Sequence, residues 1–247
     1  MKAVADPDAP DAWLGGRLRL RQPPRGAHRA GTDALLLARL VIPEPGAVVW
    51  DLGAGTGAVG LAVAVAAPGS RVVLVERDPA LAALARENAA LNGLADRVTV
   101  READLLEAAS ARHAAGLAPG LADVVLTNPP FHDRGHRPSP VPGKAAAHSF
   151  RAGDLDAWLR ACLDLLKPGG RLGLIHRADA LPACLDGLRG RFGAITVRPV
   201  HARAERAAIR VLITAVKGSR GPFGLLPPLV LQDSEGRPSP EAEAMQA

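Results

Sequence analysis

The chain has few aromatic residues, few cysteines and no long apolar run. It contains no tyrosine, and aromatic residues make up 3% of its 247 residues, so single aromatic residues such as Trp13 and Phe131 attract notice. Two cysteines, Cys162 and Cys184, are too few for a disulfide framework or a zinc-binding set. We therefore expect a reducing, cytoplasmic environment and no metal site.

Membrane segments and secretion signals are also missing from the sequence. No apolar run approaches the roughly 20 residues that a membrane helix needs, and the first residues lack the apolar core of a signal peptide. Hydrophobic residues make up 48% of the chain, which is enough for a full core. The net charge of +5 permits a polyanionic partner without establishing one. We expect a globular protein with no membrane association.

The N-terminal segment is rich in arginine. Between Asp11 and Asp33 there is no acidic residue. The arginines in this interval are Arg17, Arg19, Arg21, Arg25 and Arg29. Such a run is either a solvated face or an arm that contacts phosphates, and the sequence leaves both open. The alternation over 15–21 predicts a strand with Leu18 and Leu20 on one face, and we expect residues 1–12 to be frayed.

From residue 47 onward, strand and helix patterns alternate regularly. The predicted strands are 47–52, 71–76, 98–103, 123–128, 170–176, 194–200 and 207–217. The predicted helices are 57–66, 79–92, 105–115, 154–166 and 178–189, preceded by a helix that starts at 31–33 with Thr32 or Asp33 as N-cap. This pattern predicts one α/β domain with a mostly parallel sheet, helices on both faces and an antiparallel final pair of strands. The predicted divisions are a basic N-terminal extension with a short strand (1–30), the domain (31–217) and a C-terminal extension with a polar tail (218–247).

A glycine-rich turn follows the first strand of this domain. Gly53, Gly55 and Gly57 allow a sharp bend and the close approach of a ligand. The next strand ends at Glu76, 19 residues after Gly57, where a carboxylate suits a ribose diol. Asp104 ends the third strand, where it could meet the amine of an adenine. Together these residues predict a nucleoside-type cofactor.

Two cofactors fit a glycine turn of this kind. The segment 55–60 also matches the G-x-G-x-x-G of dinucleotide-binding folds. However, Asp51 beside the glycines would repel a pyrophosphate and could hold an ammonium group through water, and the antiparallel final strands are atypical of a dinucleotide fold. S-adenosylmethionine is therefore the predicted cofactor. The residues predicted to bind it are Asp51, Gly53, Ala54, Gly55, Gly57, Glu76, Arg77, Asp104 and Asn128.

The turn after the fourth strand of the domain has many hydrogen-bond acceptors. Pro129 and Pro130 have no N–H, and Pro129 holds Asn128 in an extended conformation. Acceptors beside the ring of Phe131 suit a planar group that carries an NH2, such as a nucleobase or an amide. An ordinary strand end beside a core phenylalanine is the other interpretation, and this turn alone favours it, whereas the rest of the chain favours a binding turn.

The two turns together resemble a known family. Residues 51–57, Glu76 and Asn128-Pro-Pro-Phe131 are similar to the class I, Rossmann-like methyltransferases that alkylate a planar amino nitrogen, over about residues 31–217. Residues 29–33, with the leucines that follow, resemble the tRNA(Val) adenine-N6 methyltransferases. The resemblance implies a seven-stranded sheet with an antiparallel last strand. Tyr is also common at the position of Phe131, and Phe keeps the stacking face.

The resemblance also implies a division of roles among the four motif residues. The amide oxygen of Asn128 and the carbonyl of Pro129 would accept the hydrogens of an adenine N6, which favours the transition state. Phe131 would stack on the extruded base. Asn128, Pro129, Pro130 and Phe131 are therefore the predicted catalytic residues. No histidine is nominated as a catalyst, because the methylated nitrogen loses its proton readily afterwards.

Three functions remain open at this point. Basic residues favour an RNA substrate, tRNA in particular; those predicted to bind it are Arg29, Arg134, Arg137 and Lys144. The same motif suits glutamine N5 methylation of a peptide release factor. A methyltransferase-like module that binds RNA without catalysis is the third interpretation, and the oligomeric state cannot be read from the sequence.

Overall fold

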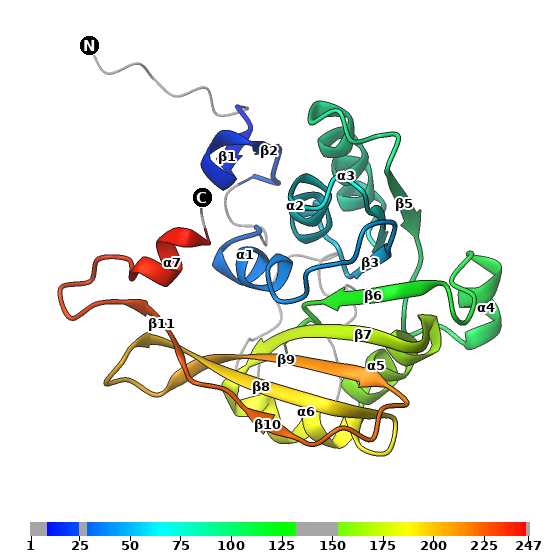
Figure 1. Cartoon of the computed structure of the whole chain (residues 1–247). Coiled ribbons are helices and arrows are strands. Elements are labelled where there is room, and N and C mark those ends of the chain that lie inside the picture. Colours follow the sequence, from blue (N-terminus) through cyan, green and yellow to red (C-terminus); the bar gives the residue numbers. More distant parts are fainter. Residues whose placement is uncertain (1–8, 25–28, 132–152, 246–247) are drawn as a thin grey trace, which may run out of the picture.

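The computed structural model describes residues 9–24, 29–131 and 153–245 of the chain (Figure 1). Its strands are β1 Asp11–Trp13, β2 Leu18–Leu20, β3 Val48–Leu52, β4 Arg71–Glu76, β5 Val98–Glu102, β6 Ala122–Thr127, β7 Leu166–Arg177, β8 Phe192–Arg203, β9 Ala208–Lys217, β10 Gly224–Leu225 and β11 Leu229–Gln232. Its α-helices are α1 Thr32–Ala38, α2 Ala58–Ala66, α3 Pro79–Leu91, α4 Ala109–Ala114, α5 Asp154–Leu165, α6 Leu181–Leu188 and α7 Pro240–Ala244.

The central sheet has the strand order β5-β4-β3-β6-β7-β9-β8, and β10 and β11 both pair with β8. Strands β3 to β7 are parallel to one another, whereas β9 is antiparallel to both β7 and β8. The predicted fold, mostly parallel with an antiparallel last strand, is confirmed. Because β9 runs backwards, its first residues reach the edge of the sheet where β3, β4, β6 and β7 end.

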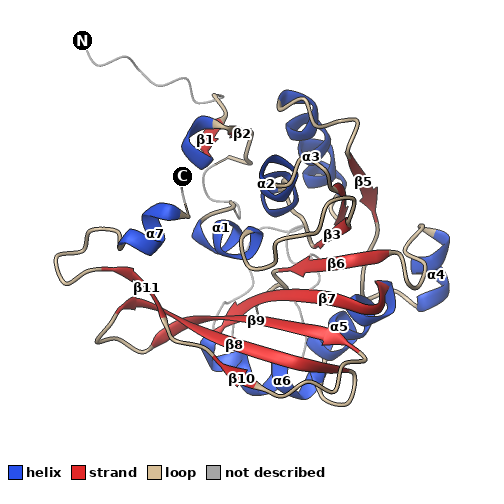
Figure 2. Ribbon diagram, in the orientation of Figure 1, coloured by secondary structure: helices blue, strands red, loops and turns tan. Residues whose placement is uncertain are grey.

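Helices cover both faces of the sheet (Figure 2). On one face a core cluster joins α1, α2 and the N-terminal strand β2, with Leu18, Leu36 and Leu61 among its buried residues. On the other face Trp158 and Leu159 of α5 pack in a second cluster with α6. Burying a leucine fully contributes about 1.5–3 kcal/mol, so both faces of the sheet are strongly held.

The structure changes several element boundaries. The first helix is capped by the backbone of Gly31, with no side-chain cap, so the predicted N-cap role of Thr32 or Asp33 is wrong. Helix α4 is shorter than predicted, because residues 105–108 form a turn instead. The helix buries no residue. Strand β7 begins earlier than predicted, since Leu166 already pairs with Ala122 of β6.

The N-terminal segment is held by two asparagine side chains, Asn88 in α3 and Asn92 at the C-cap of that helix. The amide oxygen of Asn88 accepts from Arg21 N at 2.7 Å, and its amide group donates to Arg21 O at 3.0 Å. Asn92 bonds Arg19 N and O in the same way, at 2.8 and 2.7 Å. These amides replace the partner strand that one edge of β2 would otherwise need. On its other edge, β2 pairs with β1, Asp11–Trp13. The expectation that residues 1–12 are frayed is therefore wrong for Asp11 and Ala12.

The C-terminal segment completes the molecule. Residues 218–247 were expected to be an extension and a polar tail, but β10 and β11 add to the sheet beside β8. Leu229 is buried in the core, and Ser239 caps α7 by accepting from Ala242 N. This segment is therefore packed against the domain, and the predicted domain divisions remain a prediction.

Candidate functional site

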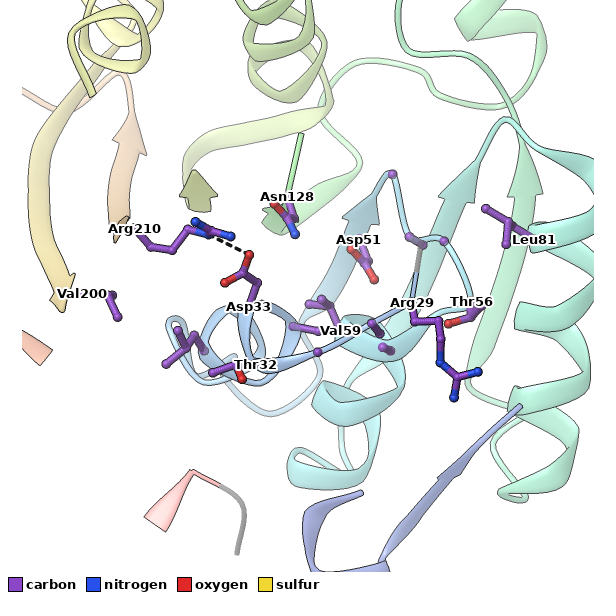
Figure 3. A pocket seen from close by; sticks show the side chains of 18 of the residues that line it. Arg29, Thr32, Asp33, Asp51, Thr56, Val59, Leu81, Asn128, Val200 and Arg210 are labelled. Atoms are coloured by element: carbon purple, nitrogen blue, oxygen red, sulfur yellow. Dashed lines mark hydrogen bonds and ion pairs between the residues drawn. The ribbon is translucent and has the colours of Figure 1, made fainter. Parts of the chain in front are cut away.

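A cavity of about 420 Å³ lies at the carboxyl edge of the parallel strands (Figure 3). The turn after β3, the beginning of α1, the end of β6 and the start of β9 all contribute to it. In Figure 3 Asn128 lies between Asp51 on one side and the Asp33–Arg210 pair on the other. The residues that line the cavity include Arg29, Asp33, Asp51, Gly53, Ala54, Gly55, Leu81, Asn128, Ile209 and Arg210.

The three glycines of the turn after β3 have different physical reasons for being glycine. All three have positive φ angles, but a Cβ atom on Gly53 would meet Trp158 at 3.0 Å and one on Gly57 would meet Leu74 at 2.9 Å. A Cβ atom on Gly55 would meet nothing within 4 Å. Gly55 therefore leaves the backbone bare toward open space at the cavity, as a closely approaching ligand requires.

Asp51 is a buried carboxyl group at the cavity wall. It is 1% exposed, and its Oδ2 accepts from Gly60 N at 2.9 Å. Burial, with a smaller contribution from the negative charge of Glu76, raises its pKa to about 7, against the lowering effect of the Gly60 hydrogen bond. A cationic ligand group nearby would favour the ionised form, so Asp51 suits an ammonium group.

Glu76 fixes the turn through both of its carboxylate oxygens. Its Oε2 accepts from Gly55 N at 2.8 Å, and its Oε1 accepts from Arg77 N and Asp78 N, both at 2.9 Å. A carboxylate has about four acceptor positions, so one remains for a ligand hydroxyl. Glu76 is in place at the predicted turn, and its predicted contact with a ribose remains a prediction.

Arg77 and Asp104 lie side by side at the ends of β4 and β5. Their side chains form an ion pair at 3.5 Å, and Asp104 Oδ1 also accepts from Leu106 N at 2.9 Å. Neither residue, nor Glu76, lines the 420 Å³ cavity. The structure brings them to the correct sheet edge, and their predicted role in binding the cofactor remains a prediction.

Asn128 follows β6 directly and carries an unpaired acceptor. Its Oδ1 atom is buried and has no hydrogen-bond partner among the described residues. The strand end before it is held firmly: Thr127 Oγ1 donates to Leu52 O at 2.8 Å and accepts from Trp158 Nε1 at 2.8 Å. A buried acceptor without a partner costs about 1–3 kcal/mol, so a ligand that donates to Asn128 would recover this cost.

The three residues after Asn128 differ in burial, and the last of them carries an aromatic ring. Pro129 is buried, Pro130 is exposed and Phe131 is partly buried. The edge of the Phe131 ring meets His176 at 5.0 Å between centroids, and the guanidinium carbon of Arg210 lies 5.2 Å from the ring centroid.

His176, at the end of β7, is neutral. Burial lowers its pKa to about 4, and its Nδ1 accepts from Arg177 N at 2.9 Å, so the ring proton is on Nε2. The ring can fix the orientation of Phe131, and at neutral pH it carries no charge.

Of the predicted substrate-binding residues, the structure describes Arg29. It lines the cavity, and its guanidinium donates to Asp11 at 2.6 Å and to Pro23 O at 2.8 Å. Arg134, Arg137 and Lys144 lie outside the described residues.

Several residues of the site were missed by the sequence analysis. His176 and Arg210 lie against Phe131, and Asp33 is paired with Arg210. Asn88 links β2 to the glycine turn by donating to Thr56 O at 3.0 Å. The last two predicted strands of the domain are antiparallel and joined by a short turn, which places the start of β9 at this edge of the sheet. That placement was a signal in the sequence that could have pointed to Arg210. No comparable signal exists for Asn88.

The described part of the chain contains no group of three or more His, Cys, Asp or Glu side chains that could hold a metal ion. Within the same residues, no helix is long and apolar enough to cross a membrane.

These features fit a nucleoside-type ligand with an amino-acid ammonium group. The bare backbone at Gly55 and the carboxyl of Asp51 lie on one side of Asn128. Asn128 lines the same cavity and carries a buried, unpaired acceptor. The arrangement can therefore bring a cofactor and a planar donor group together.

Comparisons with known proteins give one family. The description "methyltransferase small domain" matches residues 29–198. A tRNA1(Val) (adenine(37)-N6)-methyltransferase of Porphyromonas gingivalis is 31% identical over 63% of this chain and 61% of its own length. The chain thus spans about three fifths of that relative.

Two further relatives differ in the acceptor that their names give. A release factor glutamine methyltransferase of Cereibacter sphaeroides is 33% identical over 58% of this chain and 51% of its own length. The crystal structure of a predicted O-methyltransferase from Agrobacterium tumefaciens is 31% identical, covers 87% of this chain and 95% of that one, and superposes with a TM-score of 0.74.

Proposed function

The chain belongs to the methyltransferase small domain family, in which S-adenosylmethionine is the methyl donor, and we propose that it methylates the exocyclic N6 of an adenine in RNA, tRNA in particular. The enzyme is a Rossmann-like methyltransferase by fold. What the proposal adds is the acceptor atom and the polymer that carries it.

The observation that carries the proposal is the unpaired Oδ1 atom of Asn128. The atom is buried, and Asn128 lines the cavity directly after a strand whose end Thr127 and Trp158 hold in place. An amino group in a ring plane can donate to such an acceptor, whereas a deprotonated oxygen cannot. This favours nitrogen over oxygen as the methyl acceptor, in contrast to the predicted O-methyltransferase activity that names the Agrobacterium relative.

The cofactor has a matching place on the other side of Asn128. Asp51 would hold the ammonium group, and the backbone of Gly55 would lie against the nucleoside without a side chain between them. When bound, S-adenosylmethionine supplies a methyl group on a positively charged sulfur. Because Glu76 fixes Gly55, the turn is formed before the ligand arrives.

Asn128 and Phe131 would act on the adenine. The N6 lone pair is delocalised into the ring, and accepting hydrogen bonds from its two N–H groups, by Asn128 Oδ1 and the Pro129 carbonyl, favours the pyramidal nitrogen that forms the new N–C bond. Phe131 would stack on the base and align N6 for in-line transfer. The extra proton leaves afterwards to water, and neutral His176 takes no part in that step.

The choice of RNA rests on charge and on a relative. The net charge is +5, and Arg29 at the cavity belongs to an N-terminal segment in which basic residues predominate. The Porphyromonas relative is named for a tRNA substrate. A release factor glutamine carries an amide NH2 that the same acceptor could bind, so it is the second candidate.

The test is transfer of labelled methyl to the two substrates in parallel. Total small RNA from a strain that lacks the gene, and unmodified release factors from the same strain, are each incubated with the purified protein and labelled S-adenosylmethionine. Nucleoside mass analysis should find N6-methyladenosine in tRNA. Label on a release factor glutamine with none on RNA would replace the proposed substrate, and label on neither would favour a non-catalytic RNA-binding module.

A further inference from the structure

The side chain of Arg210 lies between the cavity and the ring of Phe131. Arg210 lines the cavity while Phe131 does not, and the Arg210 guanidinium carbon lies 5.2 Å from the centre of the Phe131 ring. The ring face toward the cavity is therefore covered by Arg210. A base can stack on that face only after the guanidinium has moved.

Asp33 holds Arg210 in this position. The Nε atom of Arg210 donates to Asp33 Oδ2 at 2.8 Å, and Nη1 donates to Ile209 O at 3.0 Å. Within the described residues, no hydrogen bond from Nη2 occurs. The two side chains are 27% and 24% exposed, so the pair is reached by water and adds little to stability. Another anion can therefore take the place of Asp33 at small cost.

The surroundings of Arg210 fit a nucleotide. Ile209, which is 42% exposed, lines the cavity with Val200 and Leu231, so an apolar surface lies beside the cation. A flipped nucleotide has a flat base for the apolar surface and a phosphate beside it for the guanidinium, whose planar fork matches phosphate oxygens.

We propose that Arg210 binds a phosphate next to the target base, and that Asp33 occupies the guanidinium until this phosphate arrives. The inference rests on the proposed RNA substrate. It assigns Arg210 as a substrate-binding residue that uncovers Phe131 when the nucleotide enters. It also explains why an acid is placed beside a basic substrate site: without it, the cation would have no anionic partner in the empty enzyme.

The experiment measures tRNA binding by the full chain with S-adenosylhomocysteine over a series of salt concentrations. Arg210→Ala should weaken binding about tenfold and lower the slope of log affinity against log salt by about 1, because one phosphate contact is lost. Arg210→Lys keeps the charge and should keep most of the slope. Asp33→Asn removes the competing anion and should bind tRNA as tightly as the wild type or more tightly.

The matched control is Arg189→Ala, which removes another ion-paired arginine, on the surface near the end of α6. Its affinity and slope should equal those of the wild type. An unchanged salt slope in Arg210→Ala overturns the proposal. If Asp33→Asn weakens tRNA binding as much as Arg210→Ala does, the ion pair is a structural unit and the proposal is also overturned. Methyl transfer to tRNA by the wild type is measured in parallel: its absence refutes the RNA substrate itself, whereas its presence with an unchanged slope refutes only the assignment of Arg210.

Discussion

The carboxylate of Glu76 accepts a hydrogen bond from the backbone N–H of Gly55 at 2.8 Å. The end of β4 thus fixes the turn that follows β3, in the strand beside it. The N–H of Gly55 is consequently turned toward Glu76, and the open side of Gly55 faces free space. The glycine turn is a preformed surface against which a ligand can lie.

Gly55 and Gly60 form a matched pair for testing this surface. Gly55→Ala should fold with a loss of about 1–2 kcal/mol from its left-handed conformation, and should lower cofactor affinity at least tenfold because the methyl group projects into the ligand space. Gly60→Ala places a methyl group 2.2 Å from Leu74 in the core, so its main effect should be on the free energy of unfolding. Calorimetric titration with S-adenosylmethionine and denaturant unfolding separate the two. If both variants lost cofactor affinity in the same proportion to their lost stability, the assignment of Gly55 to the cofactor-binding surface would be contradicted.

The raised pKa of Asp51 predicts a pH dependence. Its folded-state pKa is about 7, above the unfolded value of 3.8, so the folded protein holds this proton more tightly and loses stability as the pH rises from about 4 to 7. Asp51→Asn should remove that loss and, above pH 7, be more stable than the wild type by at most about 4 kcal/mol.

Cofactor binding should show the opposite trend. Because the ammonium group favours ionised Asp51, wild-type affinity for S-adenosylmethionine should rise between pH 5.5 and 7, while Asp51→Asn binds weakly and without this rise. Thermal unfolding and titration at each pH measure both effects. Parallel pH profiles for the two proteins would exclude Asp51 as the titrating group.

The sequence predicted the elements that depend on local pattern. The strands around the glycine turn and Asn128 were found because apolar strand runs, glycines and prolines are signals carried by neighbouring residues. The strand at Leu18 and Leu20 was found for the same reason, and the structure buries both leucines. Asn128 was recognised as an acceptor because the prolines after it cannot donate.

The rest depends on contacts between distant residues. Asp33 was expected to cap a helix, but its carboxylate bonds Arg210, 177 positions later in the chain. Asn88 looked like an ordinary helix residue, because nothing near it in sequence indicates that β2 would dock there. The pairing of β10 and β11 with β8 was missed because these strands are short and separated by prolines.

Asn88 and Asn92 allow a test of how the N-terminal segment is held. Each side chain makes three hydrogen bonds, but Asn88 is fully buried and Asn92 is only partly buried. Asn88→Ala should cost about 2–4 kcal/mol, since it leaves buried backbone groups unpaired, whereas Asn92→Ala should cost about 1 kcal/mol. Asn88→Ala should also weaken cofactor binding, because the side chain bonds Thr56 O in the glycine turn. Denaturant unfolding measures the costs, and equal costs for the two variants would show that water reaches both sites alike.

The most direct test of the central claim is Asn128→Ala, measured in one preparation for stability, cofactor binding and methyl transfer to tRNA. Removing a buried acceptor that has no partner should leave the free energy of unfolding within about 1 kcal/mol of the wild type, or raise it. Cofactor affinity should change less than threefold, and the single-turnover rate of N6-methyladenosine formation should fall by about 10²–10³. Transfer at the wild-type rate by a folded, cofactor-binding Asn128→Ala protein would contradict the claim that this oxygen receives the amino group of the substrate.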